Sequence, residues 1–148
     1  MAAATPINFG DIAVLIGDGA TPEVFTAPCG LTELTETTNV ETNTTNIPDC
    51  DDVDIASWLA IDEVSRQKVV SGNGMLSQEY FADWNEWDLA GGTKTIRVLY
   101  DISAGNGGGY LEGPAVLTTF EKTGSRGSKW TVSVGMTFDG KPTWVPGV

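Results

Sequence analysis

The chain has 148 residues, five of them tryptophan and 41% hydrophobic, which is enough for one domain with a core, while no apolar run reaches the roughly 20 residues that span a membrane. Its formal net charge is −12, and residues 1–65 hold twelve acidic side chains without one lysine or arginine, which argues against gripping nucleic acid by neutralising phosphates. The chain contains no histidine, which excludes Ser-His-Asp and Cys-His catalysis and imidazole metal sites.

The N-terminal part of the chain predicts two short strands. Residues 12–16 form a continuous apolar run that ends at a Gly-Asp-Gly turn, which indicates a buried strand. A second strand is expected over residues 23–27, stopped by the sequence Pro-Cys-Gly at 28–30. The first six residues have neither the basic nor the apolar segment of a secretory signal, so we expect the protein to stay in the compartment where it is made.

Residues 31–47 are rich in Thr and Asn, and neither face of this stretch is apolar enough to be buried in its own domain. Two interpretations remain open: a solvated extended segment, or a segment that becomes ordered against a neighbouring subunit. Four Asp follow within residues 49–54, without the Gly and the terminal Glu of a calcium loop. We expect a solvated acidic loop here, with a hard-cation site as the alternative. Together these features predict a long polar loop over about residues 42–62, and loops of that length are functional or disordered.

The middle of the chain predicts an edge or interface strand and one helix. Residues 64–71 have polar side chains on both faces of a strand, and the Ser-Gly-Asn-Gly sequence at 71–74 predicts a bend or bulge. A helix is expected over residues 77–89, with Ser77 as its cap and a Gly-Gly pair after it. One face of this helix carries an aromatic and aliphatic stripe: Tyr80, Phe81, Trp84, Trp87 and Leu89. Such a stripe is typical of packing against a sheet, and binding in the groove of a partner is the alternative.

The C-terminal part alternates apolar and polar residues. Strands are expected over residues 95–102 and 113–122, and the strongest over 129–140, which we predict to be the central strand of an antiparallel sheet. Its even positions from Trp130 to Phe138 are apolar, and its odd positions are small or hydroxylated. The predicted fold is mainly β: an antiparallel sandwich or partly closed barrel of about six or seven strands, in a single domain, with one flanking helix.

Nothing in the sequence singles out a catalytic or cofactor site. Cys29 has no activating base nearby in the sequence, and Cys50 lies among carboxylates, which do not activate a thiol. Two free thiols are expected, with a single disulfide as the alternative. We therefore predict that the protein is not an enzyme and uses no cofactor and no metal.

The order of these elements resembles that of the major tail tube proteins of long-tailed, non-contractile bacteriophages and of the related tails of gene transfer agents. The likeness covers most of the chain in pattern: short N-terminal strands, a long polar loop, a helix in the middle and a closing hairpin. The residues that carry it are the runs 111–117 (Leu-Glu-Gly-Pro-Ala-Val-Leu), 127–134 (Gly-Ser-Lys-Trp-Thr-Val-Ser-Val) and 135–142 (Gly-Met-Thr-Phe-Asp-Gly-Lys-Pro).

The resemblance implies a structural subunit. Members of this family form hexameric rings whose sheets join into an inner barrel with the helix outside, and the rings stack into a hollow tube. An electronegative lumen then lets double-stranded DNA slide through without specific binding. The implied partners are copies of the same chain and other tail proteins (terminator, distal tail and tape measure proteins). The implied location is a virion or gene transfer agent tail, assembled in the host cytoplasm, with no membrane insertion by this chain.

The resemblance also gives roles to the polar residues singled out above. Candidates for contacts between subunits and for ring stacking are Thr42, Asn43, Thr44, Thr45, Asp49, Asp51, Asp52 and Asp54. Candidates for lining the lumen are Thr131, Ser133, Thr137, Asp51 and Asp52.

Two other functions remain as alternatives. One is another ring protein of the same fold, such as a tail terminator or the tube of a type VI secretion system. The other is a monomeric β-sandwich module that binds carbohydrate through an exposed Trp58, Trp84 or Trp144.

Overall fold

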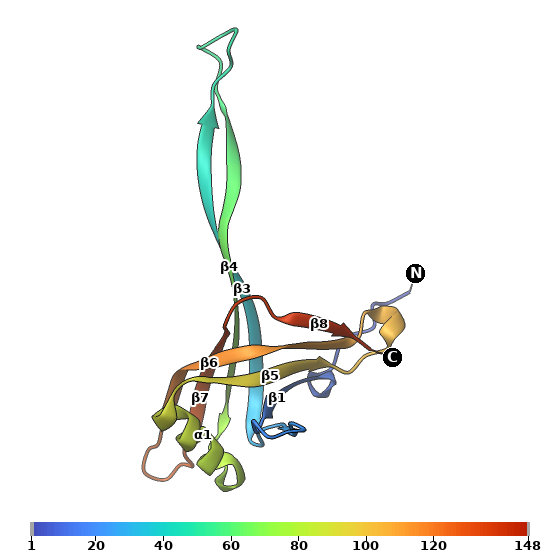
Figure 1. The fold of residues 1–148 in the computed structure, drawn as a ribbon, viewed down its shortest axis with the longest axis vertical. Coiled ribbons are helices and arrows are strands. Elements are labelled where there is room, and N and C mark those ends of the chain that lie inside the picture. Colours follow the sequence, from blue (N-terminus) through green and yellow to red (C-terminus); the bar gives the residue numbers. More distant parts are fainter. Residues whose placement is uncertain (1, 148) are drawn as a thin grey trace.

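The computed structural model describes residues 2–147, which form eight β-strands, one α-helix and two short 3₁₀ turns (Figure 1). In chain order these are η1 (Phe9–Asp11), β1 (Ile12–Gly17), β2 (Phe25–Thr26), β3 (Leu31–Ile47), β4 (Trp58–Met75), α1 (Gln78–Ala90), β5 (Thr93–Tyr100), η2 (Ala104–Asn106), β6 (Gly109–Thr123), β7 (Thr131–Phe138) and β8 (Thr143–Pro146). The predicted mainly β class with one helix is confirmed. The sequence did not indicate β8, which follows Pro142, and it indicated β3 only as an extended segment.

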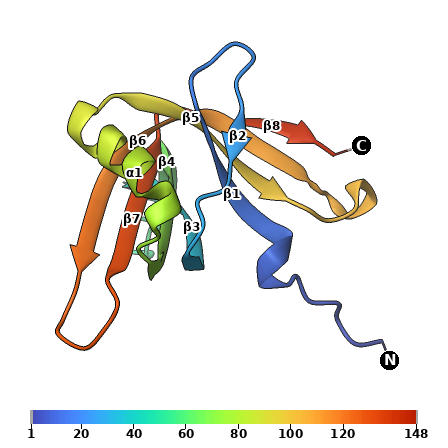
Figure 2. The ribbon, with the colours of Figure 1, turned by 90° about the horizontal axis from the view of Figure 1, so that it is seen from below.

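The strands form one antiparallel sheet in the order β2-β1-β5-β6-β7-β4-β3, with β8 paired to β6 beside this path. The path does not close on itself: β2 and β3 are its two ends. Strand direction changes strongly across the sheet, so that β1 and β5 cover the core from one side and β4 and β7 from the other (Figure 2).

The alternation at the C-terminal end is confirmed in β7. Val132, Val134, Met136 and Phe138 are all buried in the core, at most 4% exposed. Trp130, which continues this apolar series, is 57% exposed, so the expectation that it joins the buried core was wrong. It precedes the first paired residue of β7 and lies at the end of the sheet, beyond the reach of the core residues that cover the rest of the strand.

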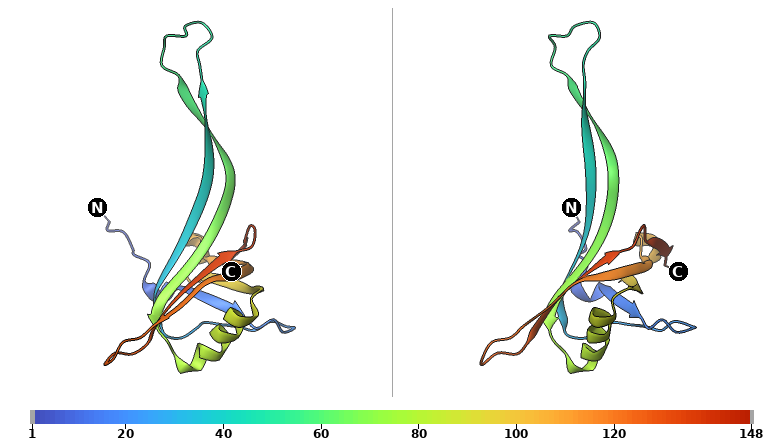
Figure 3. Two further views of the ribbon diagram at one scale, coloured as in Figure 1. Left: turned by 90° about the vertical axis from the view of Figure 1, so that its left-hand side faces the viewer. Right: turned by 60° about the vertical axis from the view of Figure 1, so that its left-hand side comes forward.

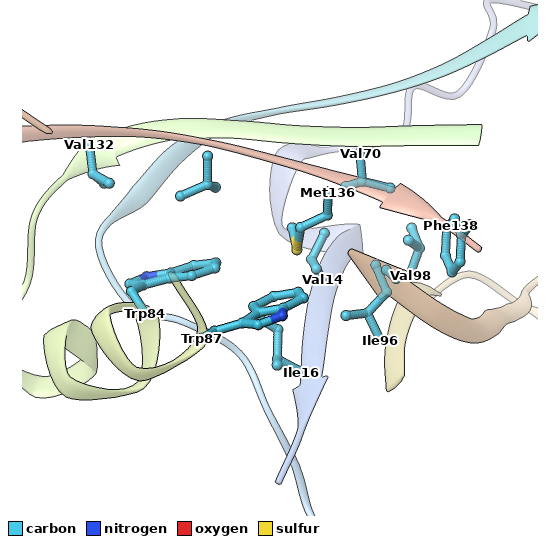
Figure 4. Close-up of a cluster of buried hydrophobic side chains, with 12 residues drawn as sticks. Val14, Ile16, Val70, Trp84, Trp87, Ile96, Val98, Val132, Met136 and Phe138 are labelled. Atoms are coloured by element: carbon cyan, nitrogen blue, oxygen red, sulfur yellow. The ribbon is translucent and has the colours of Figure 1, made fainter. Parts of the chain in front are cut away.

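The helix contributes two tryptophans to this core (Figure 4). Trp84 and Trp87 are 3% and 2% exposed, and their rings stack with centroids 6.3 Å apart. The other end of the predicted stripe is not buried, because Leu89 is 78% exposed. Gly91, with φ of 69°, ends the helix as expected, and its N–H donates to the carbonyl oxygen of Trp87 at 2.9 Å.

The long polar loop expected over residues 42–62 is instead mostly strand, and only residues 48–57 lie outside it. β3 and β4 pair with each other along their whole length, out to Ile47↔Trp58, and project as a long hairpin from the body (Figures 1 and 3). The prediction failed because it required a buried face. Pairing satisfies the backbone hydrogen bonds of both strands even where neither face is covered.

Residues 71–74, expected to bend or bulge, remain paired with β7, while their pairing with β3 shows a register shift at Asn73 and Gly74. Here glycine serves a close approach of two backbones. A Cβ atom on Gly74 would lie 2.7 Å from Leu31 Cα and still nearer to the carbonyl oxygen of Gly30. The start of β3 therefore packs directly on the end of β4.

Candidate assembly surfaces

The part of the hairpin beyond the body, residues 40–66, is here called the distal hairpin. It contains no buried residue. It nevertheless carries large apolar side chains that are more than half exposed: Ile47, Val53, Ile55, Trp58, Leu59, Ile61 and Val64. Trp58 is the extreme case, at 87% exposed. A concentration of exposed apolar surface on so thin a projection is typical of a site that contacts another protein.

Residues 48–57 form the tip of the hairpin, and two of its carboxylates shape the turn. Asp49 Oδ1 accepts hydrogen bonds from the N–H groups of Asp51 and Asp52, at 2.7 and 3.1 Å. Asp52 Oδ1 accepts one from the N–H of Asp54, at 3.0 Å. Such Asx turns account for Asp at positions 49 and 52. Within residues 2–147 no group of three or more His, Cys, Asp or Glu side chains is arranged to hold a metal ion.

All eight residues predicted for contacts between subunits lie on the distal hairpin. Four are in β3 and pair with β4 in the order Thr42↔Glu63, Asn43↔Asp62, Thr44↔Ile61 and Thr45↔Ala60. The other four, Asp49, Asp51, Asp52 and Asp54, are in the tip. The structure thus brings them onto one projection. Their role in stacking stays a prediction.

The base of the hairpin is fastened to the body by a polar cluster that the sequence analysis missed. Lys68 Nζ lies 2.9 Å from Glu36 Oε1, and the Tyr100 hydroxyl donates a hydrogen bond to Glu36 Oε2. Burial, and then the neighbouring Glu36 carboxylate, raise the pKa of Tyr100 above its ordinary range. The three residues come from β3, β4 and β5, so the cluster ties the hairpin to the far half of the sheet.

The polar face of β7 carries Thr131, Ser133 and Thr137, as the alternation predicts. The strand registers place hydroxyl and amide side chains beside them: Ser133 is opposite Asn73 of β4, which is in turn opposite Glu33 of β3. On the other side, Ser133 is opposite Glu121 of β6. Asp51 and Asp52, also predicted to line a lumen, lie in the tip of the hairpin and not on this sheet face.

The same registers assign the cations of these strands to the opposite face. Lys122 is opposite the buried Val132, and Lys68 is two positions from the buried Val70 and so shares its face. On β3, β4, β6 and β7 around Ser133, the charged members of the polar face are therefore Glu33 and Glu121. Within these strands the face is uncharged to acidic, and Lys129, two residues before Thr131, lies at its end beside Thr131 and Ser133.

The tryptophans considered for carbohydrate binding do not form one site. Trp84 is buried in the core, so its expected exposure was wrong. Trp58 is on the distal hairpin, and Trp144, 44% exposed, is on β8 and packs near Tyr100, with ring centroids 5.7 Å apart. Cys29 and Cys50 are both exposed free thiols.

Some functional candidates escaped the sequence analysis. The exposed apolar residues of the distal hairpin carry a signal that was available, because the apolar group at 58–61 stands inside a polar and acidic segment. The Glu36, Lys68 and Tyr100 cluster carries none, since Tyr100 is 64 positions from Glu36. No helix within residues 2–147 is long and apolar enough to cross a membrane.

Comparisons with known proteins agree on one family. A family model described as "Phage tail tube protein" matches residues 6–144. No curated protein sequence matches the chain. The chain is similar in fold to the tail of an empty gene transfer agent particle, a structure with C6 symmetry: the TM-score is 0.71 at 17% identity, covering 93% of this chain and 98% of that one.

Two other solved structures share the fold. The tail tube of SPP1 matches with a TM-score of 0.70 and 11% identity, over 97% of this chain and 81% of that one. The tube-terminating cap of the anti-feeding prophage matches with a TM-score of 0.61 and 15% identity, over 99% and 95% of the two chains. At these identities the likeness establishes the fold.

Proposed function

The chain belongs to the phage tail tube protein family, and on that premise we propose that it is the structural subunit of a phage-like tail tube, in which hexameric rings stack into a hollow conduit for DNA. The observation that carries this proposal is the distal hairpin. It is a two-stranded projection with no buried residue and a row of exposed apolar side chains, Trp58 the most exposed. Such a projection is completed by contact with another copy.

Ring formation is supported by the open sheet. Its terminal strands, β2 and β3, leave backbone groups available at the two ends, and an exposed edge strand is a template for pairing with another chain. Head-to-tail contacts of this kind close into rings. The sixfold symmetry of the similar gene transfer agent tail makes six the expected number of subunits.

We assign the polar face of β7 to the lumen. Thr131, Ser133 and Thr137 would line it, together with Glu33 and Glu121 from the neighbouring strands. A wall that is hydroxyl-rich and acidic along these strands repels phosphates over most of its length, with Lys129 at its end, so double-stranded DNA passes without specific binding. Asp51 and Asp52 would add negative charge where the tip of one ring reaches the next.

The role in this proposal is structural and not catalytic. The subunit would reside in the tail of a virion or a gene transfer agent particle, assembled in the host cytoplasm. Its partners would be further copies of itself and the other tail proteins, namely terminator, distal tail and tape measure proteins. The Thr- and Asn-rich stretch and the acidic tip would be the contacts between rings.

The test is electron microscopy of the purified, concentrated protein beside a variant with a shortened hairpin. In that variant Asn-Gly replaces residues 42–64 and joins Glu41 to Ser65, which already pair, through a two-residue turn. We expect hollow tubes from the unmodified chain and folded, unstacked subunits or single rings from the variant. Matching circular dichroism and melting curves would show that the variant keeps its fold. Normal tubes from the shortened chain would contradict the stacking role.

A second candidate function is that of a ring protein that caps a tube, or of the tube of a type VI secretion system. The likeness to the tube-terminating cap of the anti-feeding prophage favours the first of these. The same microscopy separates the two, because a cap forms single rings whereas a tube subunit polymerises without a fixed length.

A further inference from the structure

At the end of the molecule opposite the hairpin tip lies an apolar groove of about 460 Å³. Its walls come from the end of β4, the start of α1 and the approach to β7. Its large apolar side chains are Met75, Leu76, Phe81 and Trp130. Trp130 and Met75 are 57% and 52% exposed, which is unusual for residues adjoining a core strand. This is the position at which the alternation of β7 predicts a buried tryptophan and the subunit provides no cover.

The rim of this groove is basic. Lys129 lines it, Lys122 Nζ lies 5.6 Å from the centre of the Phe81 ring, and Arg126 is in the turn between β6 and β7. The ion pairs within residues 2–147 use Arg66, Lys68 and Arg97, so none of the three rim cations has an acidic partner. Three of the eight basic residues of the chain thus lie at this end without an ion pair among the described residues.

The tip of the distal hairpin has the complementary character. It contains four Asp and no base, and it exposes Val53 and Ile55 at 83% and 54%. Figure 1, drawn with the longest axis vertical, places the tip at one end of that axis and the β6–β7 turn with α1 at the other. A tip therefore cannot reach the groove of its own chain.

We propose that this groove receives the tip, residues 48–57, of a second copy of the chain, with Val53 and Ile55 on the apolar floor and the aspartates against Arg126 and Lys129. Complementary surfaces at opposite ends of one molecule form a head-to-tail contact, which repeats without closing and so builds a stack. Burial of an exposed tryptophan at the centre, with charges at the rim, is the usual anatomy of a strong contact. The inference rests on the proposed stacking of rings and names the surface that accepts the hairpin.

The native Cys50 in the tip allows a direct test by cross-linking. The test variant carries Cys29→Ser, which removes the other native thiol, and Ser128→Cys, which places a thiol beside Lys129 at the rim of the groove. A short bis-maleimide then joins thiols that lie close together in assembled tubes. Because positions 50 and 128 are at opposite ends of one chain, every cross-link between them joins two copies. We expect a ladder of covalent multimers in denaturing electrophoresis.

Two control variants test whether the covalent multimers come from cross-links between positions 50 and 128. Adding Cys50→Ser should abolish the ladder, and placing the new thiol at the exposed position 103 in the loop before η2, as Ser103→Cys, should give none. Tubes without a ladder that joins position 50 to position 128 would overturn this inference and leave the tube function standing. A concentrated protein that forms neither rings nor tubes would overturn both.

Charge reversal gives an independent readout. Arg126→Glu with Lys129→Glu should raise the protein concentration needed for tubes by about tenfold or more, because like charges then meet across the contact. Asp51→Lys with Asp52→Lys in the same chain should restore assembly. Tubes formed by the reversed variant at the unmodified concentration would overturn the assignment. Both substituted sites are exposed, so the fold is expected to survive.

Discussion

The body of the subunit and its distal hairpin are built from the same kind of strand but are stabilised by different forces. In the body, alternating apolar residues of β1, β5 and β7 enclose Trp84 and Trp87, and twelve apolar side chains are buried. In the distal hairpin nothing is buried, and the strands hold each other through backbone hydrogen bonds. The body is stable because of its side chains. The hairpin has its shape because of its backbone.

This difference shows that a regular pair of strands can form where no hydrophobic core covers either face. An isolated two-stranded hairpin is marginally stable in water, and the distal hairpin keeps its register because β4 continues into the sheet, where it also pairs with β7. Its side chains are therefore not constrained by a core, which leaves them available for the proposed contact with other copies. A mutation in the body should change the stability of the subunit, and a mutation in the distal hairpin should change its assembly.

The sharpest way to break this comparison is to truncate one tryptophan in each region. Trp87→Ala should lower the free energy of unfolding by about 3–5 kcal/mol, because it empties the centre of the core. Trp58→Ala should change it by less than about 0.5 kcal/mol, because the side chain is in solvent, yet it should impair tube formation. Urea unfolding followed by circular dichroism measures the first effect and electron microscopy the second. Equal losses of stability in Trp87→Ala and Trp58→Ala would refute the distinction between a stabilising body and an assembly hairpin.

The packing of the start of β3 on the end of β4, inside the body, should respond almost as strongly to a single methyl group. Gly74→Ala should destabilise the subunit by about 1–3 kcal/mol, because its Cβ would press on the backbone of Gly30 and Leu31. Gly105→Ala is the matched control, since a Cβ there meets nothing within 4 Å. Thermal unfolding of both variants measures the difference. A Gly74→Ala variant as stable as its control would show that the two strands separate easily at this point.

The polar fastening of the hairpin should have a smaller effect. Tyr100→Phe should cost about 1–2 kcal/mol, because it removes a hydrogen bond to the Glu36 carboxylate in a half-buried place. Tyr110→Phe is the control, because the Tyr110 hydroxyl makes no hydrogen bond to another side chain within residues 2–147. Denaturant titration of the two variants compares them, and equal midpoints would mean that the fastening contributes no stability.

The same tyrosine predicts a loss of stability in alkali. Burial and the Glu36 carboxylate raise the pKa of Tyr100 above its ordinary value of 10.0, so the folded state keeps a proton that the unfolded state loses. The stabilisation is complete below that ordinary value and declines as the pH rises through and beyond it. Unfolding curves at about pH 9 and about pH 11 should therefore differ more for the unmodified chain than for Tyr100→Phe. If the unmodified chain and Tyr100→Phe lost equal stability between these two pH values, the burial of Tyr100 beside Glu36 would be contradicted.

The smallest effect is expected at the tip. Asp49→Ala removes the acceptor of two backbone hydrogen bonds, but the loop is in solvent, so the free energy of unfolding should change by less than about 0.5 kcal/mol. The change should be local: amide hydrogen exchange at residues 51 and 52 should accelerate. Asp51→Ala is the control, because its carboxylate accepts no hydrogen bond from the described residues. Equal exchange in both variants would contradict the turn.

The body was largely predictable, because its signal is periodic. Alternation located β7, β5 and the apolar run of β1, and Gly91 marked the end of the helix. The periodicity does not show how far along β7 other core residues pack on its apolar face, which is why Trp130 was expected in the core. The distal hairpin was mistaken for a loop because single-sequence reasoning looks for an apolar face, and strands paired only with each other need none.

The candidate residues also fall into two groups, those that composition can identify and those that depend on which strands become neighbours. The eight residues expected at subunit contacts were found as a group through their composition, since the acidic and Thr-rich segment is contiguous. The Glu36, Lys68 and Tyr100 cluster and the groove at Trp130 depend on which strands become neighbours. Composition and alternation carry no information about that, because the partners come from different parts of the chain.

The continuity of β4 also determines how the subunit transmits force. From the distal hairpin this strand runs unbroken into the sheet, where it lies between β3 and β7. A pull on the tip acts along the strand and across its hydrogen bonds, which are perpendicular to it. The bonds between β4 and β7, over the pairs Val69↔Thr137 to Met75↔Thr131, then share the load at once instead of opening in succession. In the proposed stack, tension between copies would thus be delivered in shear to β4 and β7, which hold the buried Val70 and Met136.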